Sequence, residues 1–287
     1  MNAIERAKLS LEGLSVGDAF GERTMHSPAR ASTLRDRVAL KGPWSWTDDT
    51  AMAISIVDEL AAGNGIDPAS LAKRFGRRWA SEPARGYGSG AHQVLEELAA
   101  GVHHEIAAKK LFNGEGSRGN GGGMRSAPVG AYYAGELDAV ALHAARSAAP
   151  THAHPDGAAG AVAVAVAAAC AFAGERDPRA LLETVVARTP DGPTRDGVRR
   201  AIAMLRAEPV TVAAEVGNGS RVLAADTIPF AVWCAATHLG DYAGGLWACA
   251  SVGGDIDTTC AMVGGIVVGA VGLAGIPDAW RAAREPL

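Results

Sequence analysis

Two short acidic stretches, one near each end of the chain, decide how this sequence is interpreted. The first is Trp46-Thr47-Asp48-Asp49-Thr50, and the second is Gly253-Gly254-Asp255-Ile256-Asp257-Thr258-Thr259. An apolar run follows each of them, Thr50–Val57 after the first and Cys260–Val263 after the second. Because Asp and Thr side chains accept the unpaired N–H groups of a helix start, both stretches predict the beginning of an apolar helix.

A second carboxylate in each stretch is more than a helix start requires. One acceptor is sufficient there, and an additional charge in a partly buried position is costly unless a cation neutralises it. Carboxylate and hydroxyl oxygens are the ligands that Mg²⁺, Ca²⁺ and Mn²⁺ prefer. If the two stretches meet in space, their Asp and Thr side chains can hold two such ions. Capping without metal remains the alternative for either stretch taken alone.

The composition is that of an ordinary soluble protein. The chain has 287 residues, of which 48% are hydrophobic and 20% charged, and its formal net charge is −4. A chain of this length can bury a large core, and we expect one domain over residues 1–287. The charge argues against nucleic acid as the main partner. Bound phosphate groups would therefore have to be held by local backbone donors.

Several features indicate a cytoplasmic protein that does not enter a membrane. The first residues lack the apolar core of a signal peptide, and the four cysteines show no C-x-x-C spacing. Two uncharged runs, residues 157–174 and 258–276, approach the length of a membrane span. Both are rich in Ala and Gly, which allow helices to pack closely. We expect them to be central helices of a soluble bundle.

The apolar periodicity predicts helices and no strand, hence an all-α fold. The alternating run Val162–Val166 resembles a strand, but its continuation in Ala favours a buried helix. Gly17 and Gly21 are four residues apart and predict a close helix contact, whereas residues 25–43 are polar and predict a loop over the site. The predicted helices span residues 3–19, 50–62, 67–79, 89–100, 105–112, 124–134, 136–149, 157–174, 178–188, 194–206, 209–216, 226–239, 241–251, 259–274 and 277–284.

A glycine-rich segment, Gly114–Arg125, has the composition of an anion-binding loop. It carries six glycines in the ten residues 114–123 and leads into an apolar helix. Glycine lets the backbone approach a phosphate closely, with N–H groups pointing at it. A flexible linker is the alternative, but Asn120 and Arg125 are not linker residues. The similar triplet Gly217-Asn218-Gly219 has no apolar helix behind it, so we expect a turn there.

The segment Thr151-His152-Ala153-His154 is open to two interpretations. The histidine spacing does not match a typical zinc site. His152 can form either a structural hydrogen bond or one to a ligand, whereas His154 with Pro155 is typical of a helix start.

Taken in order, five motifs resemble those of the ADP-ribosylglycohydrolase family, which includes dinitrogenase reductase-activating glycohydrolase and the eukaryotic ADP-ribosylhydrolases. They are Gly17–Gly21, Trp46–Thr50, Gly119–Gly121 with Met124-Arg125, Thr151-His152 and Gly253–Thr258. The resemblance implies a single-domain orthogonal helical bundle with two Mg²⁺, or Mn²⁺, ions in a cleft. It also implies hydrolysis of the bond that joins ADP-ribose to a modified side chain, often arginine and in some members serine. The partner would be an ADP-ribosylated protein or a small molecule that contains ADP-ribose.

The resemblance also implies roles for individual residues. The implied metal ligands are Thr47, Asp48, Asp49, Asp255, Asp257 and Thr258, with Asp257 as the bridge between the ions. The implied substrate-binding residues are Phe112, Gly116, Ser117, Arg118, Gly119, Asn120, Gly121, Gly122, Gly123, Met124 and His152. The implied catalytic residues are Asp48, Asp49, Asp257 and Glu22.

One position departs from the family pattern. Members commonly carry a metal-linked or catalytic Glu a few residues after the second glycine of the first motif, and here the fourth residue after Gly21 is Met25. Either Glu22 takes that role or the role is lost. Two other functions therefore remain open: a dinuclear phosphohydrolase acting on a nucleotide-like substrate, and a non-catalytic protein that binds ADP-ribose.

Overall fold

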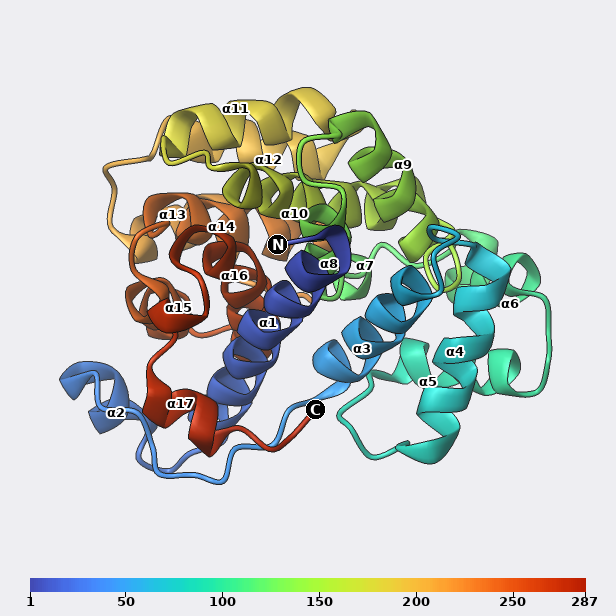
Figure 1. Cartoon of the computed structure of the whole chain (residues 1–287), viewed down its shortest axis with the longest axis horizontal. Helices are drawn as coiled ribbons and strands as arrows, with labels where there is room; N and C mark the ends of the chain where they lie inside the picture. Colours follow the sequence, from blue (N-terminus) through green and yellow to red (C-terminus); the bar gives the residue numbers. More distant parts are fainter.

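The computed structural model describes all 287 residues, and every regular element in it is helical (Figure 1). The predicted all-α fold is confirmed. The α-helices are α1 (Ala3–Met25), α2 (Arg30–Asp36), α3 (Asp48–Ala61), α4 (Pro68–Ser81), α5 (Ser89–Ala99), α6 (His104–Lys110), α7 (Gly121–Met124), α8 (Ala127–Tyr132), α9 (Leu137–Ala148), α10 (Pro155–Ala173), α11 (Pro178–Arg188), α12 (Pro193–Ile202), α13 (Pro209–Val216), α14 (Ala224–Thr237), α15 (Tyr242–Ser251), α16 (Ile256–Val271) and α17 (Asp278–Ala283). Two short 3-10 helices, η1 (Leu111–Gly114) and η2 (Leu273–Gly275), complete the chain.

Helices α1 and α16 lie against each other at the centre, and glycine makes this contact possible. A methyl group added at Gly17 would lie 2.2 Å from the carbonyl oxygen of Cys260, and one added at Gly21 would lie 2.5 Å from the Cα of Asp257. Any side chain at these two positions would push the helices apart. The close helix contact predicted from the glycine spacing is therefore found, and it brings the second half of α1 beside the start of α16.

Helix α10, of 19 residues, lies in the core. It includes the alternating run Val162–Val166, which is helical as expected. By length and composition alone α10 could cross a membrane, but 83% of its most apolar window is buried inside this structure. That burial is typical of the central helix of a bundle. Helices α8, α9, α11, α14 and α16 all pack against it.

Two segments differ from the sequence prediction. Helix α1 continues to Met25, so the motif Gly17–Gly21 lies within a helix, and the predicted loop after it contains the short helix α2. The single helix predicted over residues 124–134 is divided into α7 and α8. Pro128 explains the break, because it has no N–H to donate and its ring would clash with the carbonyl group of the preceding turn.

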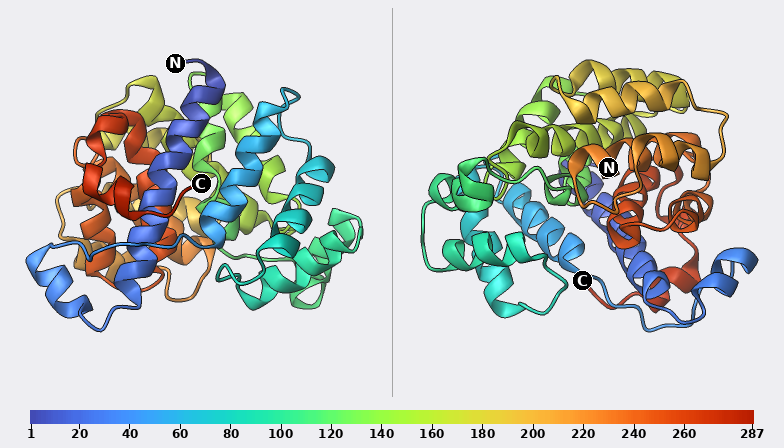
Figure 2. Two further views of the ribbon diagram at one scale, coloured as in Figure 1. Left: turned by 60° about the horizontal axis from the view of Figure 1, so that its bottom comes forward. Right: turned by 180° about the vertical axis from the view of Figure 1, so that it is seen from behind.

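The remaining helices form two groups on either side of the central pair. Helix α3 packs against α1, and α4, α5 and α6 continue outward from it, as both views of Figure 2 show. Helices α11 to α15 lie around α10 and α16 on the opposite side. The starts of α3 and α16 therefore meet between the two groups.

Candidate active site

The first acidic stretch forms the start of helix α3. Thr47 is the N-cap residue and accepts a hydrogen bond from the backbone N–H of Asp49 at 3.4 Å. Asp48 and Asp49 are the first two residues of the helix, and Asp49 is buried. A cap is therefore present, but Thr47 supplies it, and neither carboxylate is used for capping.

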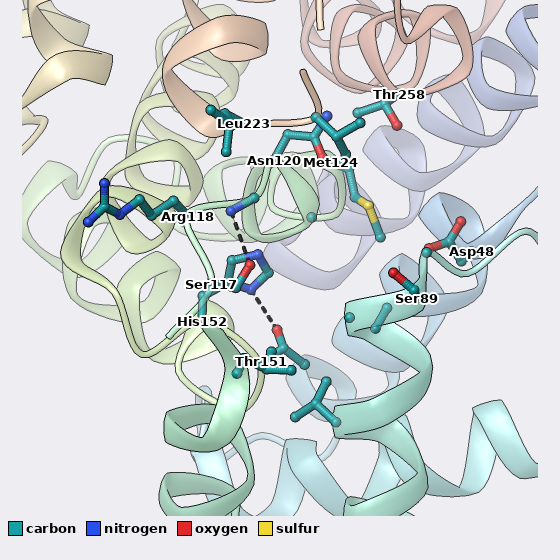
Figure 3. Close-up of a pocket in the computed structure, with 18 of the residues that line it drawn as sticks. Asp48, Ser89, Ser117, Arg118, Asn120, Met124, Thr151, His152, Leu223 and Thr258 are labelled. Atoms are coloured by element: carbon teal, nitrogen blue, oxygen red, sulfur yellow. Dashed lines mark hydrogen bonds between the residues drawn. The ribbon is translucent and has the colours of Figure 1, made fainter. Parts of the chain in front are cut away.

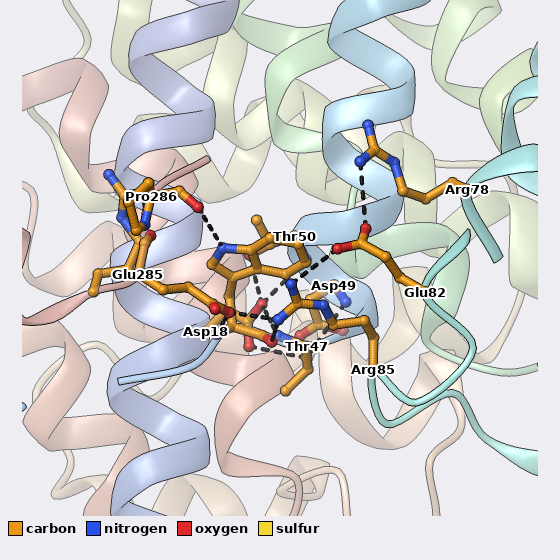
Figure 4. A network of polar contacts seen from close by, with 11 residues as sticks. Asp18, Thr47, Asp49, Thr50, Arg78, Glu82, Arg85, Glu285 and Pro286 are labelled. Atoms are coloured by element: carbon orange, nitrogen blue, oxygen red, sulfur yellow. Dashed lines mark hydrogen bonds and ion pairs between the residues drawn. The ribbon is translucent and has the colours of Figure 1, made fainter. Parts of the chain in front are cut away.

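Asp18 of helix α1 holds this helix start in place (Figure 4). Its Oδ2 accepts hydrogen bonds from Thr47 N at 2.9 Å, Thr50 N at 3.1 Å and Thr50 Oγ1 at 2.5 Å. Its Oδ1 accepts a further one from Thr47 Oγ1 at 2.9 Å. The fully buried Asp18 thus satisfies donors that the helix start cannot pair internally.

The second acidic stretch meets the first one. Thr258 Oγ1 donates to Asp49 Oδ1 at 3.4 Å, across 209 residues of sequence. Asp255 is the N-cap residue of α16 and Asp257 lies in its first turn. Asn120 of the glycine-rich segment donates through Nδ2 to Asp255 Oδ2 at 2.7 Å. Three segments that are distant in sequence therefore converge at one point.

The carboxylates at this point repel one another. Burial, followed by the charges of Asp18 and Asp257, raises the pKa of Asp48 and of Asp49 well above the ordinary range. Burial and the neighbouring Asp257 raise the pKa of Asp255 to about 7. Such shifts indicate a concentration of negative charge at this point.

Two buried carboxylate oxygens, Asp49 Oδ2 and Asp257 Oδ1, have no hydrogen-bond partner. An unpartnered carboxylate oxygen in a buried position is costly, and a divalent cation removes that cost. No three acidic, histidine or cysteine side chains converge closely enough to form a finished ligand set on their own. In charge and in donor type, however, these residues fit a hard divalent cation.

The glycine-rich segment forms the opposite side of the site. Gly116 has a φ of +78°, and a side chain there would collide with Ala153 and with the N–H of His154. Gly119 pairs with Leu223, and the N–H of Asn120 donates to the carbonyl oxygen of Val222 at 3.1 Å. The segment is therefore held by two neighbouring loops and is not a free linker.

A buried polar chain supports His152 behind this loop (Figure 3). Arg125 Nη2 donates to Thr151 Oγ1 at 2.7 Å, and Thr151 Oγ1 lies 2.7 Å from His152 Nδ1. Burial, followed by the charge of Arg125, lowers the pKa of His152 to about 3. His152 is therefore neutral at physiological pH.

These groups line one cleft of about 650 Å³. Among the residues singled out from the sequence, fourteen line it: Asp48, Asp49, Phe112, Gly116, Ser117, Arg118, Gly119, Asn120, Gly121, Met124, His152, Asp255, Asp257 and Thr258. Phe112 is 64% exposed at its wall. The acidic end and the glycine-rich loop share one cavity, large enough for a nucleotide-sized ligand.

Four of the singled-out residues do not line the cleft. Thr47 lies behind the carboxylates and faces Asp18. Gly122 and Gly123 lie in α7, where a side chain would collide with helix α10 or with Ile228. Glu22 lies on α1 and pairs with His26 at 3.3 Å, its side chain 34% exposed. Burial raises the pKa of Glu22, and the charge of Asp257 adds to that rise.

Other residues of the site were given no role from the sequence. Ser89, Arg125 and Val222 also line the cleft, and Asp18 holds the start of α3 behind it. Val222 has a φ of +56°, which is rare for a β-branched residue and typical of functional loops. Asp18 lies within the motif Gly17–Gly21, which was its signal in the sequence.

In this all-α scaffold the core helices place a carboxylate cluster opposite a glycine-rich loop, an arrangement that suits a ligand with phosphate groups. Comparison with known proteins identifies the family. The sequence profile of the ADP-ribosylglycohydrolase family matches residues 1–286. The chain belongs to the ADP-ribosylglycohydrolase family. It is 30% identical over 273 residues to human "ADP-ribosylhydrolase ARH3", covering 84% of this chain and 74% of the human protein.

Two further similarities agree with this membership. A solved structure described as "ADP-ribosylglycohydrolase-related protein complex" has a TM-score of 0.70 and 25% identity, covering 99% of this chain and 93% of that one. A shorter match, 35% identity over 80 residues, links the chain to "ADP-ribosylarginine hydrolase Tri1" of Pseudomonas putida, and it covers 26% of this chain and 21% of that protein. The family expected from the five motifs is confirmed.

Proposed function

We propose that this protein is a cytoplasmic, Mg²⁺-dependent hydrolase that removes ADP-ribose from a modified arginine or serine side chain. Membership of the ADP-ribosylglycohydrolase family supports this proposal, as does the similarity to a protein named as an ADP-ribosylhydrolase. Mn²⁺ is the alternative ion, because it accepts the same oxygen ligands.

One observation carries the proposal. Two buried carboxylate oxygens, Asp49 Oδ2 and Asp257 Oδ1, lack partners in a cleft whose other wall is a glycine-rich loop. A ligand that carries a diphosphate and a ribose offers a group to each side of such a cleft. The diphosphate fits the loop, and the ribose that bears the scissile bond then lies at the acidic end.

The residues on the glycine-rich side of the cleft would bind the ADP part of the ligand. The N–H groups of Ser117, Arg118 and Gly121, which pair with no acceptor of the chain, would bind the diphosphate. The neutral His152 would support the loop beside Gly121, where an added methyl group would lie 3.3 Å from its ring. Phe112 is exposed in the cleft and offers a flat apolar surface to the base. The loop thereby fixes the position of the ribose relative to the carboxylates.

The residues that would hold the ions are Asp48, Asp49, Asp255, Asp257 and Thr258, with Thr47 behind them. When bound there, Mg²⁺ supplies positive charge that lowers the pKa of a water molecule. A carboxylate of the second acidic stretch, which includes Asp257, would assist proton transfer as the anomeric bond breaks. Glu22 would assist only after turning away from His26. As in other glycosidic cleavages, we expect an oxocarbenium-like transition state.

The test is incubation with arginine-linked and serine-linked ADP-ribosyl peptides, with Mg²⁺ and with a chelator, followed by mass spectrometry. We expect free ADP-ribose and unmodified peptide from at least one linkage, only when Mg²⁺ is present. Asp257→Asn should slow release by roughly 100-fold or more. Asp241→Asn, which removes an exposed capping carboxylate at the start of α15, is the matched control and should retain the activity.

Other products would overturn the proposal. Release of AMP or inorganic phosphate would indicate a phosphohydrolase. Binding of ADP-ribose without turnover, observed as a thermal shift, would indicate a non-catalytic binding protein, which the methionine at position 25 makes a specific alternative.

A further inference from the structure

Residues 283–286 run alongside residues 44–46, next to the first acidic stretch. The N–H of Trp44 donates to the carbonyl oxygen of Ala283 at 2.7 Å, and the N–H of Glu285 donates to the carbonyl oxygen of Trp44 at 2.9 Å. Two residues after Trp44, the N–H of Trp46 donates to the side-chain Oε1 of Glu285 at 3.0 Å. The Glu285 carboxylate therefore extends the pairing by one residue, up to the cap of helix α3.

Arg85 closes this arrangement from the other side (Figure 4). Its Nη1 donates to Glu285 Oε1 at 2.5 Å and to the carbonyl oxygen of Trp46 at 3.3 Å. Its guanidinium carbon lies 3.4 Å from the centre of the Trp46 ring. The indole N–H of Trp46 donates to the carbonyl oxygen of Pro286 at 3.2 Å. Every polar group of Trp46 is therefore paired with Arg85 or with residues 285–286.

Fixing Trp46 has a direct consequence for the residues that follow it. Trp46 precedes Thr47, whose own N–H is held by Asp18 at 2.9 Å. The peptide that enters helix α3 is thus bound from two sides, by Asp18 of α1 and by the pair of Arg85 and Glu285. Because the first residues of α3 are Asp48 and Asp49, their direction depends on how this peptide is oriented.

Arg85 also links this peptide to the wall of the cleft. Gly86 follows it with a φ of +87°, and a methyl group added at Gly86 would lie 3.7 Å from Asp48 Oδ1. Gly86, Gly88, Ser89 and Gly90 all line the cleft. Arg85 is held in turn by Glu82, whose Oε1 accepts from Nη2 at 3.0 Å.

We infer that Arg85 and Glu285 are positioning residues, which together orient the peptide before Thr47 and so set the direction of the Asp48 and Asp49 carboxylates. Neither residue lines the cleft, so neither acts on the substrate. The part of this inference that concerns cation binding rests on the proposed function, whereas the part that concerns the order of helix α3 does not.

The first test measures order without any metal. Hydrogen exchange followed by mass spectrometry reports how readily the amides of residues 46–50 open. In Glu285→Ala and in Arg85→Gln we expect these amides to exchange about tenfold faster or more, equivalent to about 1.4 kcal/mol of local stability. Amides of helix α10 should exchange as in the parent protein. Unchanged exchange at residues 46–50 in both variants would overturn the inference.

The second test measures cation binding. Titration calorimetry with Mg²⁺ should show about tenfold weaker affinity in Glu285→Ala, within the range typical of residues that orient ligands indirectly. Glu285→Gln retains an acceptor oxygen for the Trp46 N–H and should recover part of that loss. If the parent protein bound no Mg²⁺, the proposed function would fail, and the exchange experiment would still decide the positioning role.

Glu59→Gln is the matched control. Glu59 lies at the other end of the same helix and accepts from Arg74 Nε at 2.6 Å, so the substitution removes an arginine-paired carboxylate of comparable geometry. We expect a lower melting temperature, with exchange at residues 46–50 and Mg²⁺ affinity both unchanged. If Glu59→Gln weakened Mg²⁺ binding as much as Glu285→Ala, the effect would be general destabilisation, and the positioning role would be wrong.

Discussion

The side-chain amide of Asn120 donates to Asp255 at 2.7 Å, and this bond joins the glycine-rich loop to the second acidic stretch. The same Nδ2 group also donates to Thr227 Oγ1 at 3.1 Å, which fixes the orientation of the amide. Asn120 is buried, so water does not replace these contacts. The phosphate side and the carboxylate side of the cleft are therefore mechanically connected through one side chain.

Asn120→Ala should weaken both the binding of Mg²⁺ and the release of ADP-ribose. Loss of the amide leaves Asp255 free to turn, and residues that orient ligand carboxylates typically contribute about 10-fold to 100-fold in affinity or activity. We expect Mg²⁺ affinity and kcat/KM to fall by that factor, measured by calorimetry and by release of ADP-ribose. Asn64→Ala, in an exposed turn, is the control. A decrease in peptide turnover with unchanged Mg²⁺ affinity would show that Asn120 serves only the substrate.

Substitutions at Asp18 should separate hydrogen bonding from charge. Asp18→Ala leaves four donors of Thr47 and Thr50 without their acceptor, and we expect a loss of about 3 kcal/mol in the free energy of unfolding. Asp18→Asn can keep its oxygen toward three of those donors and donate to Thr47 Oγ1, so the loss should be about 1 kcal/mol. Urea unfolding without metal measures both. Equal losses would mean that the charge, and not the acceptor geometry, matters.

Gly17→Ala tests the contact between helices α1 and α16. The added methyl group would lie 2.2 Å from the carbonyl oxygen of Cys260, which requires the backbones to separate. Overpacking of this kind costs about 1–3 kcal/mol or more. Thermal unfolding should show a markedly lower melting temperature. Gly240→Ala has open space around it and should change stability by less than about 1 kcal/mol. If the two variants had the same melting temperature, the close contact between α1 and α16 would not be needed for stability.

His152 should make stability depend on pH. Its pKa is lowered to about 3 in the folded protein, below the ordinary value of about 6.5 in the unfolded chain. Between these values the unfolded chain binds the extra proton, so the stabilising contribution is complete above about pH 6.5 and is lost as the pH falls. The slope is up to about 1.4 kcal/mol per pH unit.

The measurement is urea unfolding of the parent protein and of His152→Gln between pH 4 and pH 7. Because other groups titrate in both proteins, the difference between them isolates His152. We expect that difference to diminish toward acidic pH, as the parent loses stability faster. A constant difference would mean that His152 is already protonated in the folded state or is accessible to water.

The sequence by itself determined the features that depend on near neighbours. Thr47 begins helix α3 because its side chain reaches an N–H two residues away, and the apolar run at Val162–Val166 becomes helical because the Ala residues around it favour a helix. The glycines at 17 and 21 predicted a close contact, although they did not name helix α16 as the partner. The five ordered motifs identified the family, since their residues can be read directly from the chain.

Only the tertiary structure decided which of these residues meet. Thr258 reaches Asp49 across 209 residues because α1 and α16 are in backbone contact, and no local preference encodes that distance. The same packing gives Asp18 its four donors, and it gives Glu285 its place beside Trp46. A local hydrogen bond depends on residues a few positions away. The direction of a buried carboxylate depends on the side chains that the tertiary packing brings next to it.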